Sequence, residues 1–179
     1  MNGYEITEAL NSFRIIADTR EQTTPKARER FKAFGVPVER ATLRYGDYCG
    51  QITLPEGDLY DQSLRISPKC VVERKMSIDE LAMCLGKQRD RFRREFERAS
   101  NNDSKVWLLV EGASWEAIEN HRYRSMMHPN ALIGSIVAWM TRYDASLIFC
   151  KAGTSGRMIK EVLYRDMKER LERGDFDGS

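Results

Sequence analysis

Residues 70–80 read CVVERKMSIDE, and this stretch decides how the chain is organised. Its apolar start is typical of a buried strand, and the S-x-x-E spacing that opens at Ser77 predicts a capped helix immediately afterwards. An acid and two bases lie between the two elements. Because side chains alternate across a strand, Glu73 and Lys75 are expected on one face and Arg74 on the other. The side chains of Glu73 and Lys75 can therefore reach the same point in space.

The rest of the chain alternates between strand and helix patterns. Strands are expected over 13–18, within 37–55, and over 64–75, 105–112 and 145–150. Helices are expected over 23–34, 77–100, 114–123, 129–143 and 154–174, with a polar loop over 56–63. Pro68 lacks a backbone N–H, which favours an edge strand or a bulge, whereas the apolar run of 105–112 is typical of a central strand. This order predicts an α/β fold with a mixed central sheet and helices on both faces.

The composition bounds the class of protein. A chain of 179 residues is expected to form one domain, here 13–173, with an N-terminal extension over 1–12 and a disordered tail over 174–179. The net charge of +2 does not by itself indicate a nucleic-acid partner. Four widely spaced cysteines without a C-x-x-C pair favour reduced thiols and an intracellular protein. The sequence lacks the pattern of a signal peptide or a membrane span, so a soluble protein is expected.

Asp47 supplies the second acid that a metal site would need. It follows Gly46 in an extended segment, and if that segment pairs with 70–75, the carboxylates of Asp47 and Glu73 meet. Two carboxylates suit Mg²⁺ or Mn²⁺, and the ammonium of Lys75 would orient a water nucleophile and stabilise charge on a phosphate. The alternative is a solvated strand end, with surface ion pairs worth about 0–1 kcal/mol. An acid followed at a distance by E-x-K is a weak pattern in itself.

The motif around these residues resembles that of a known family. The nuclease domain of the XPF-type structure-specific endonucleases, a branch of the PD-(D/E)xK superfamily, carries the signature G-D-x(n)-E-R-K-x-x-x-D. This sequence matches every specified position, with Gly46, Asp47, Glu73, Arg74, Lys75 and Asp79. The likeness extends over 13–165, where IIADTREQ at 15–22 resembles the opening strand of the family. The resemblance implies a restriction-endonuclease-like mixed sheet.

The resemblance also implies a catalytic set, consisting of Asp18, Asp47, Glu73, Arg74, Lys75 and Asp79. The first three of these would hold the metal ion, and Lys75 would position the attacking water. Alternation turns Arg74 away from the metal, towards a structural partner or a DNA phosphate. Asp79 has a structural alternative of equal weight, because the dipole of a helix favours any carboxylate in its first turn.

Basic residues give a second functional signal. A stripe at helical spacing is expected to bind DNA phosphates and comprises Lys87, Arg91, Arg94 and Arg98. The alternative is a solvated face, because acids are interspersed along this helix. Arg20, from the segment DTRE at 18–21, is expected to bind DNA as well. Glu21 either pairs with Arg20 or lies near the metal. Glu111 ends the central strand, where it either neighbours the site or caps the turn at Gly112.

Together these features predict a Mg²⁺- or Mn²⁺-dependent DNA endonuclease. By resemblance its substrates are flaps, forks and other junctions, and the alternatives are a junction resolvase, a duplex nuclease or a silent DNA-binding subunit. Many XPF-type enzymes carry a helix-hairpin-helix domain, for which this chain is expected to have no room. Apolar stripes on helix 129–143 and the final helix would suit a homodimer, although core packing explains them equally well. The cytoplasm, the nucleoid or a eukaryotic nucleus is the expected location.

Overall fold

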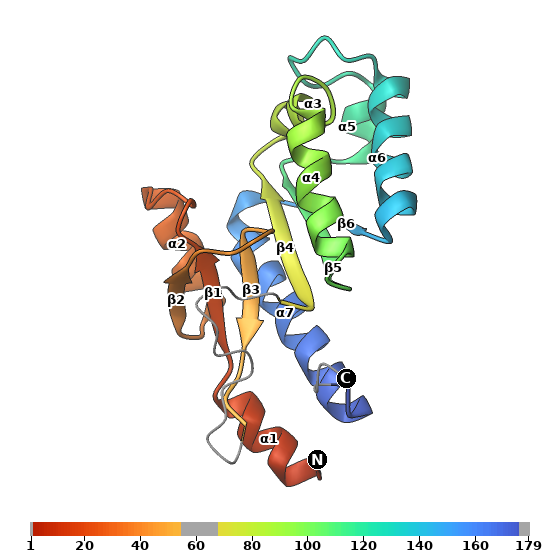
Figure 1. Ribbon diagram of the computed structural model, residues 1–179. Helices are drawn as coiled ribbons and strands as arrows, with labels where there is room; N and C mark the ends of the chain where they lie inside the picture. Colours follow the sequence, from red (N-terminus) through yellow and green to blue (C-terminus); the bar gives the residue numbers. More distant parts are fainter. Residues whose placement is uncertain (1, 55–67, 176–179) are drawn as a thin grey trace.

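A six-stranded mixed sheet forms the centre of the computed structural model, which describes residues 2–54 and 68–175. The strand order is β2-β1-β3-β4-β5-β6. The strands are β1 (Arg14–Asp18), β2 (Val38–Ala41), β3 (Tyr48–Gln51), β4 (Cys70–Lys75), β5 (Lys105–Glu111) and β6 (Ser146–Cys150) (Figure 1). β3 runs antiparallel to both of its neighbours, and the other neighbouring pairs are parallel. The predicted mixed sheet is confirmed.

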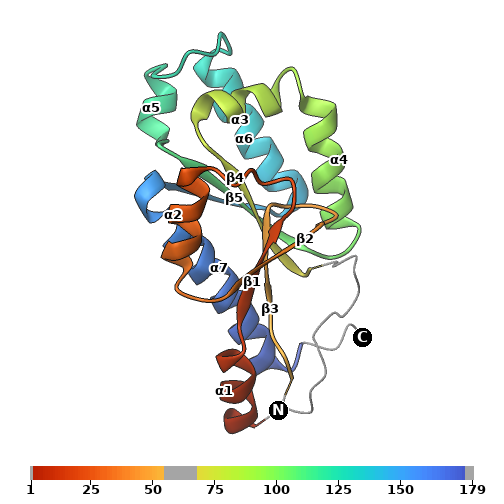
Figure 2. The same ribbon diagram turned by 90° about the vertical axis from the view of Figure 1, so that its left-hand side faces the viewer.

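Helices cover both faces of the sheet, as the sequence predicts (Figures 1 and 2). One face carries α3 (Ile78–Leu85), α4 (Arg89–Ser100), α5 (Trp115–Glu119) and α6 (Pro129–Tyr143). The other face carries α1 (Gly3–Asn11), α2 (Pro25–Phe34) and α7 (Ala152–Arg173). Each layer buries its own apolar cluster against the sheet, which fixes the helices relative to the strand ends.

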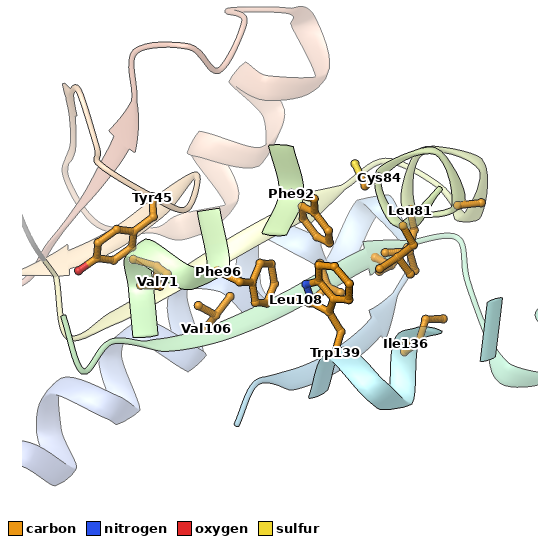
Figure 3. Close-up of a cluster of buried hydrophobic side chains, with 14 of the residues drawn as sticks. Tyr45, Val71, Leu81, Cys84, Phe92, Phe96, Val106, Leu108, Ile136 and Trp139 are labelled. Atoms are coloured by element: carbon orange, nitrogen blue, oxygen red, sulfur yellow. The ribbon is translucent and has the colours of Figure 1, made fainter. Parts of the chain in front are cut away.

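Aromatic packing fixes α4 on the first face (Figure 3). Phe92 stacks on Trp139 with ring centroids 5.8 Å apart, and Phe96 meets both rings at steep angles. On the second face the buried stripe of α7 packs against the strands through Ile159, Leu163, Met167 and Leu171. Core packing therefore accounts for the apolar stripe of the final helix, and homodimerisation stays a prediction.

Sequence signals set the ends of the helices that flank the strand ends. The Thr24 hydroxyl caps α2, and Gly35 ends it with φ of 66°, a left-handed conformation that glycine adopts without strain. At α3 the Ser77 hydroxyl accepts the Glu80 N–H at 3.2 Å. The Glu80 carboxylate in turn accepts the Met76 N–H at 2.7 Å, one residue earlier than a standard capping box requires. Strand β4 thus passes into α3 within two residues.

The single helix predicted over 77–100 is wrong. α3 ends at Leu85, α4 begins at Arg89, and Gly86 departs from helical geometry with φ of −107° and ψ of −100°. Glycine has a low helix propensity because its backbone loses the most freedom on ordering. Lys87 consequently lies in the break between two helices rather than on the stripe that the sequence predicts.

Of the two alternatives predicted for Pro68, an edge strand or a bulge, the edge strand is wrong. β4 lies inside the sheet, between β3 and β5, and starts at Cys70, so Pro68 precedes it and costs it no hydrogen bond. The loop expected over 56–63 lies outside the described residues. Residues 1–12, expected only as an extension, contain helix α1. The division of the chain into domain and flanking segments stays a prediction, and 176–179 of the expected tail lie outside the described residues.

Within residues 2–54 and 68–175, none of the helices combines the length and the apolarity that crossing a bilayer requires. All four cysteines are free thiols, and three of them, Cys49, Cys70 and Cys84, are buried.

Candidate active site

The sheet topology brings the candidate acids to one edge. β1 and β4 end where β3 begins, because β3 is antiparallel to both. Asp47, the residue before β3, accepts the Asp18 N–H at its carbonyl at 2.8 Å and donates its own N–H to the Val72 carbonyl at 2.9 Å. Asp18, Asp47 and Glu73 therefore come from three adjacent strands at the same end of the sheet.

Gly46 lets the chain pass close to β4 just before Asp47. Its φ is +72°, and a Cβ at this position would lie 2.6 Å from the Cβ of Val71. Any side chain would meet both the backbone strain and this clash. The glycine of the G-D pair thus sets the path that brings the aspartate to the end of β4.

Asp47 and Glu73 form an acid pair. Burial, followed by the charge of Glu73, raises the pKa of Asp47 well above its ordinary value. Glu73 is itself buried, with 5% of its surface exposed. Among the residues that the structure describes, the hydrogen bond to the Asp47 carboxylate comes from the Arg74 backbone N–H, which donates to Oδ2 at 2.8 Å. The charge of Lys75 offsets this acid pair only in part, and a partly compensated pair of carboxylates favours a bound cation.

Lys75 supplies a positive charge beside the acid pair. Its Nζ lies 2.5 Å from Glu73 Oε1 and 5.0 Å from the centre of the Phe92 ring. Burial alone would lower the pKa of Lys75, but the charges of Glu73 and Asp47 outweigh it and raise that pKa, so the ammonium form is held. The predicted shared face of Glu73 and Lys75 is confirmed.

A cavity of about 780 Å³ opens over these groups. Asp47, Glu73 and Lys75 lie in its wall. Cations of three other segments join them, namely Arg20, Lys26 and Arg91. Glu95 of α4 also lines the cavity, and burial followed by the charge of Glu73 raises its pKa. Glu21, Glu80, Arg30 and Arg74 line the cavity as well, so acids and cations are mixed along it. This lining supplies carboxylates for a cation and cations for a phosphate.

Asp18 is engaged with the protein itself. Its carboxylate accepts the Arg20 side chain at 2.7 and 2.9 Å, the Arg20 N–H at 2.7 Å and the Leu43 N–H at 2.8 Å. Burial raises the pKa of Asp18, and these hydrogen bonds more than offset it. Asp18 does not line the cavity. Its role as a metal ligand stays a prediction, and it would require the bond to Arg20 to open.

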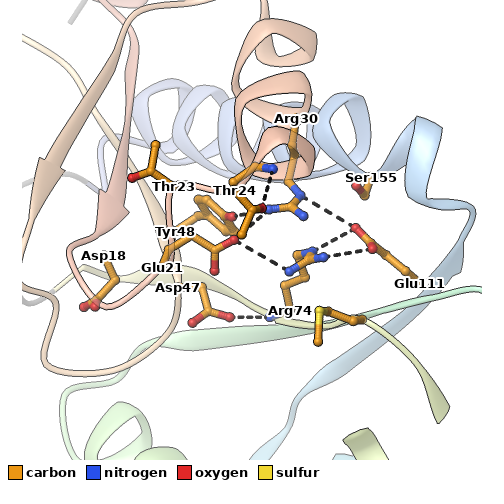
Figure 4. Close-up of polar contacts among 12 residues, drawn as sticks. Asp18, Glu21, Thr23, Thr24, Arg30, Asp47, Tyr48, Arg74, Glu111 and Ser155 are labelled. Atoms are coloured by element: carbon orange, nitrogen blue, oxygen red, sulfur yellow. Dashed lines mark hydrogen bonds and ion pairs between the residues drawn. The ribbon is translucent and has the colours of Figure 1, made fainter. Parts of the chain in front are cut away.

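Arg74 points to the opposite face, into a buried ionic network (Figure 4). Its Nε and Nη2 donate to the two oxygens of Glu111 at 2.8 and 2.9 Å. Arg30 of α2 donates to Glu21 at 2.7 Å and to the Tyr48 hydroxyl at 3.0 Å. Of the two alternatives for Arg74, the contacts favour a structural partner over a DNA phosphate. Glu21 pairs with Arg30 rather than with Arg20. It also lines the cavity, and a place near the metal stays a prediction for it.

The Asp79 side chain binds a loop and does not line the cavity. Its Oδ1 accepts the N–H groups of Arg124 and Ser125 at 2.7 and 2.8 Å, in the connection between α5 and α6. It is absent from the cavity wall. These contacts favour the structural alternative for Asp79.

The basic stripe is only partly associated with the cavity. Arg91 lines it, with 69% of its side chain exposed and Glu95 at 3.8 Å. Arg94 is exposed outside the cavity wall, and Arg98 donates to the Arg44 carbonyl at 3.1 Å. Arg91 is therefore the member of the stripe that is best placed to meet a phosphate at the acid pair.

The donor set fits a divalent metal through two carboxylates. Among the described residues no group of three or more His, Cys, Asp or Glu side chains is arranged to hold a metal ion. Asp47 and Glu73 alone would leave most coordination positions to water and phosphate oxygens, which is how Mg²⁺ is commonly bound. Burial and the charge of Glu73 keep the pKa of Asp47 raised even though the charge of Lys75 lowers it, so the negative charge of Asp47 is only partly compensated.

Arg30 and Glu95 are residues that sequence reasoning misses. Arg30 falls on the buried stripe of α2 with Ala27 and Phe34, and a charge on an apolar face is a signal that could have marked it. Glu95 carries no such signal, because acids and bases alternate along the whole of α4.

The fold defines an α/β domain that is similar to the XPF nuclease fold. Two solved structures are similar to it: XPF from Aeropyrum pernix, with a TM-score of 0.58, and the same protein in complex with DNA, with a TM-score of 0.60. Both are 23% identical and cover 86% and 88% of this chain. This chain covers 61% and 66% of theirs, which is less than two thirds of either.

The family follows from the sequence match. The model of the ERCC4 domain matches residues 17–162, and the chain belongs to the ERCC4 domain family. No curated protein matches the sequence significantly.

Proposed function

We propose that this protein is a metal-dependent DNA endonuclease that hydrolyses phosphodiester bonds at branched DNA such as flaps and forks. One observation carries the proposal: Asp47, Glu73 and Lys75 converge in a cavity whose walls supply Arg20, Lys26 and Arg91. Membership of the ERCC4 domain family supports it. One of the similar structures is described as a complex with DNA, which supports DNA as the ligand.

The residues of the site divide the work. Asp47 and Glu73 would hold Mg²⁺ or Mn²⁺, which supplies Lewis-acid stabilisation of the phosphate when bound. The Lys75 ammonium, fixed by Glu73, would orient the attacking water and stabilise negative charge that develops on the phosphate oxygens. Arg91 and Arg20 would bind flanking phosphates. The products would be a 3′-hydroxyl and a 5′-phosphate.

The test is a panel of labelled DNA substrates. Purified protein with Mg²⁺ or Mn²⁺ is expected to cut flaps and forks faster than intact duplex, and EDTA is expected to stop the reaction. Preferred cutting of four-way junctions or duplex would instead favour a resolvase or a duplex nuclease. Binding of every substrate without cutting would identify a silent DNA-binding subunit and end the enzyme proposal.

Arg91 and Arg94 give a matched pair for the phosphate-binding part of the proposal. Arg91→Ala is expected to weaken DNA binding and to lower the slope of log affinity against log salt concentration by about 1, because one phosphate contact is lost. Arg94→Ala removes the same charge outside the cavity and serves as the control. Fluorescence anisotropy with EDTA present measures binding without cleavage. Equal effects of both substitutions would mean that the cavity does not guide the DNA backbone.

A homodimer and an intracellular location also remain proposals. On α6 the side chain of Val137 is 51% exposed, so this helix keeps an apolar residue that the core does not use. Sedimentation velocity of the wild type tests whether a dimer forms.

A further inference from the structure

The arginine of the E-R-K triplet acts on the other side of the sheet from its two neighbours. Only 9% of its surface is exposed. Nε and Nη2 bond to Glu111, and Nη1 faces Glu21 at 3.7 Å. Although Arg74 lines the cavity, its three guanidinium nitrogens face the carboxylates of buried Glu111 and half-buried Glu21, so the group is already engaged within the protein.

The backbone of Arg74, in contrast, reaches the candidate active site. Its N–H donates to Asp47 Oδ2 at 2.8 Å. The same residue thus faces the site with its peptide group and the ionic network with its side chain (Figure 4). Movement of the Arg74 side chain would therefore also move the Arg74 peptide N–H, which donates to the Asp47 carboxylate.

Glu111 is the residue that fixes this side chain. It ends β5, the parallel neighbour of β4, and lies two residues beyond Leu109, the partner of Arg74 in the ladder. A bidentate contact between a carboxylate and a guanidinium restrains both distance and orientation. Glu111 is 5% exposed, and Arg30 Nε lies 3.6 Å from its Oε1. Glu111 therefore joins β4, β5 and α2 behind the site.

We propose that Glu111 is a positioning residue of the candidate active site: by fixing the Arg74 guanidinium, it fixes the peptide N–H that orients the Asp47 carboxylate. The proposal rests on the proposed function for its catalytic consequence. Its structural part, that Glu111 fixes the Arg74 peptide N–H, does not depend on the proposed function. Glu111 belongs to neither the G-D pair nor the E-R-K triplet. It ends β5, whereas Asp47, the acid whose orientation it would fix, precedes β3.

The direct test uses Glu111→Gln. Glutamine keeps the size of the side chain, but its amide NH₂ cannot accept a hydrogen bond from Arg74, so the bidentate contact is lost. The exchange of the Arg74 amide hydrogen, followed by NMR, is expected to accelerate relative to that of Leu108 in the neighbouring strand. The comparison within one sheet separates local loosening from general destabilisation, which would speed up both amides.

Metal binding gives a second readout that needs neither DNA nor cleavage. Calorimetric titration with Mn²⁺ is expected to show about 10-fold weaker binding for Glu111→Gln, the size of effect typical when a partner of a ligand is lost. The kcat for flap cleavage is expected to fall about 10-fold as well, with the KM for DNA unchanged. Glu161→Gln, at an exposed ion pair of α7, is the matched control.

The outcomes distinguish the inference from the proposed function. If the wild type cuts no DNA but Glu111→Gln still loosens the Arg74 amide, the function fails and the inference stands. If the amide exchange and Mn²⁺ binding of Glu111→Gln equal those of the wild type, the inference is overturned even when cleavage occurs. A rise in KM alone would indicate that Arg74 contacts DNA, which also overturns it.

A second variant covers the case in which Glu111→Gln does not fold. Arg74→Met with Glu111→Met replaces both charges by apolar side chains, which buried ion pairs often tolerate, and leaves Arg30 bonded to Glu21. This variant keeps the peptide N–H at position 74 but not its anchor. It is expected to show the same faster exchange at that amide, and slow exchange there would contradict the inference.

Discussion

Asp47→Asn is expected to abolish DNA cleavage while making the metal-free protein more stable. Loss of a metal ligand removes several kcal/mol of transition-state stabilisation, or about 1,000-fold or more in rate. The asparagine carbonyl oxygen still accepts the Arg74 N–H, so the local backbone is kept. What disappears is a negative charge that burial and Glu73 destabilise.

The gain in stability distinguishes a functional acid from a structural one. An aspartate whose pKa is raised in the folded protein opposes folding in its charged form, so its neutral analogue is expected to raise the free energy of unfolding by about 1 kcal/mol. Urea denaturation in EDTA measures this change. Asp90→Asn, with an 81% exposed side chain in the first turn of α4, is the control: it is expected to leave cleavage unchanged and not to raise stability, because the helix dipole favours a carboxylate there.

Two results would count against this account of Asp47. Cleavage that survives Asp47→Asn would place the metal elsewhere. A clear loss of stability would mean that the carboxylate serves the fold, as Asp18 does through its bonds to Arg20 and Leu43.

Lys75→Met is expected to lower kcat by about 100- to 10,000-fold with little change in DNA affinity. The ammonium is held at the acid pair, only 7% of the residue is exposed, and methionine fills similar space beside Phe92. Because substrate binding depends on the exposed cations instead, anisotropy in EDTA should match the wild type. Single-turnover cleavage of a flap substrate measures the chemical step.

In this experiment a loss of activity has to be separated from a loss of stability, because Lys75 neutralises the buried acid Glu73. Removing one partner of a buried ion pair costs about 3–5 kcal/mol, so Lys75→Met is expected to be less stable than the wild type. Glu73→Gln combined with Lys75→Met removes both charges and should recover stability without recovering cleavage. Lys168→Met, on the surface of α7, should change nothing. Full activity of folded Lys75→Met would exclude the lysine from the reaction.

Local patterns in the sequence predict much of the site. Alternation along 70–75 places Glu73 and Lys75 on one face and Arg74 on the other, because the geometry of a strand depends on nearest neighbours alone. The cap at Ser77 and the glycine after α2 likewise act within a few residues. The sequence does not reveal the break at Gly86, because the apolar spacing on both sides continues a helical period.

Partner choice among charged residues is much harder to predict. The sequence does not indicate that Asp18 accepts hydrogen bonds from Arg20, or that the Arg74 guanidinium meets Glu111. In the sequence, many acidic residues are chemically alike, and so are many basic residues. Which of them meet depends on the order of strands and on which helix covers which face.

The sequence by itself determined the α/β class, the strand that ends in E-R-K and the faces of its three charges, because these follow from short-range periodicity and capping. Only the tertiary structure decided that Asp47 meets the end of β4 through the antiparallel register of β3, that Asp79 holds a loop, and that Glu111 stands behind Arg74. Residues 37 positions apart in the chain make that last contact. The physical reason is that such contacts depend on how distant elements pack, and no local pattern encodes that packing.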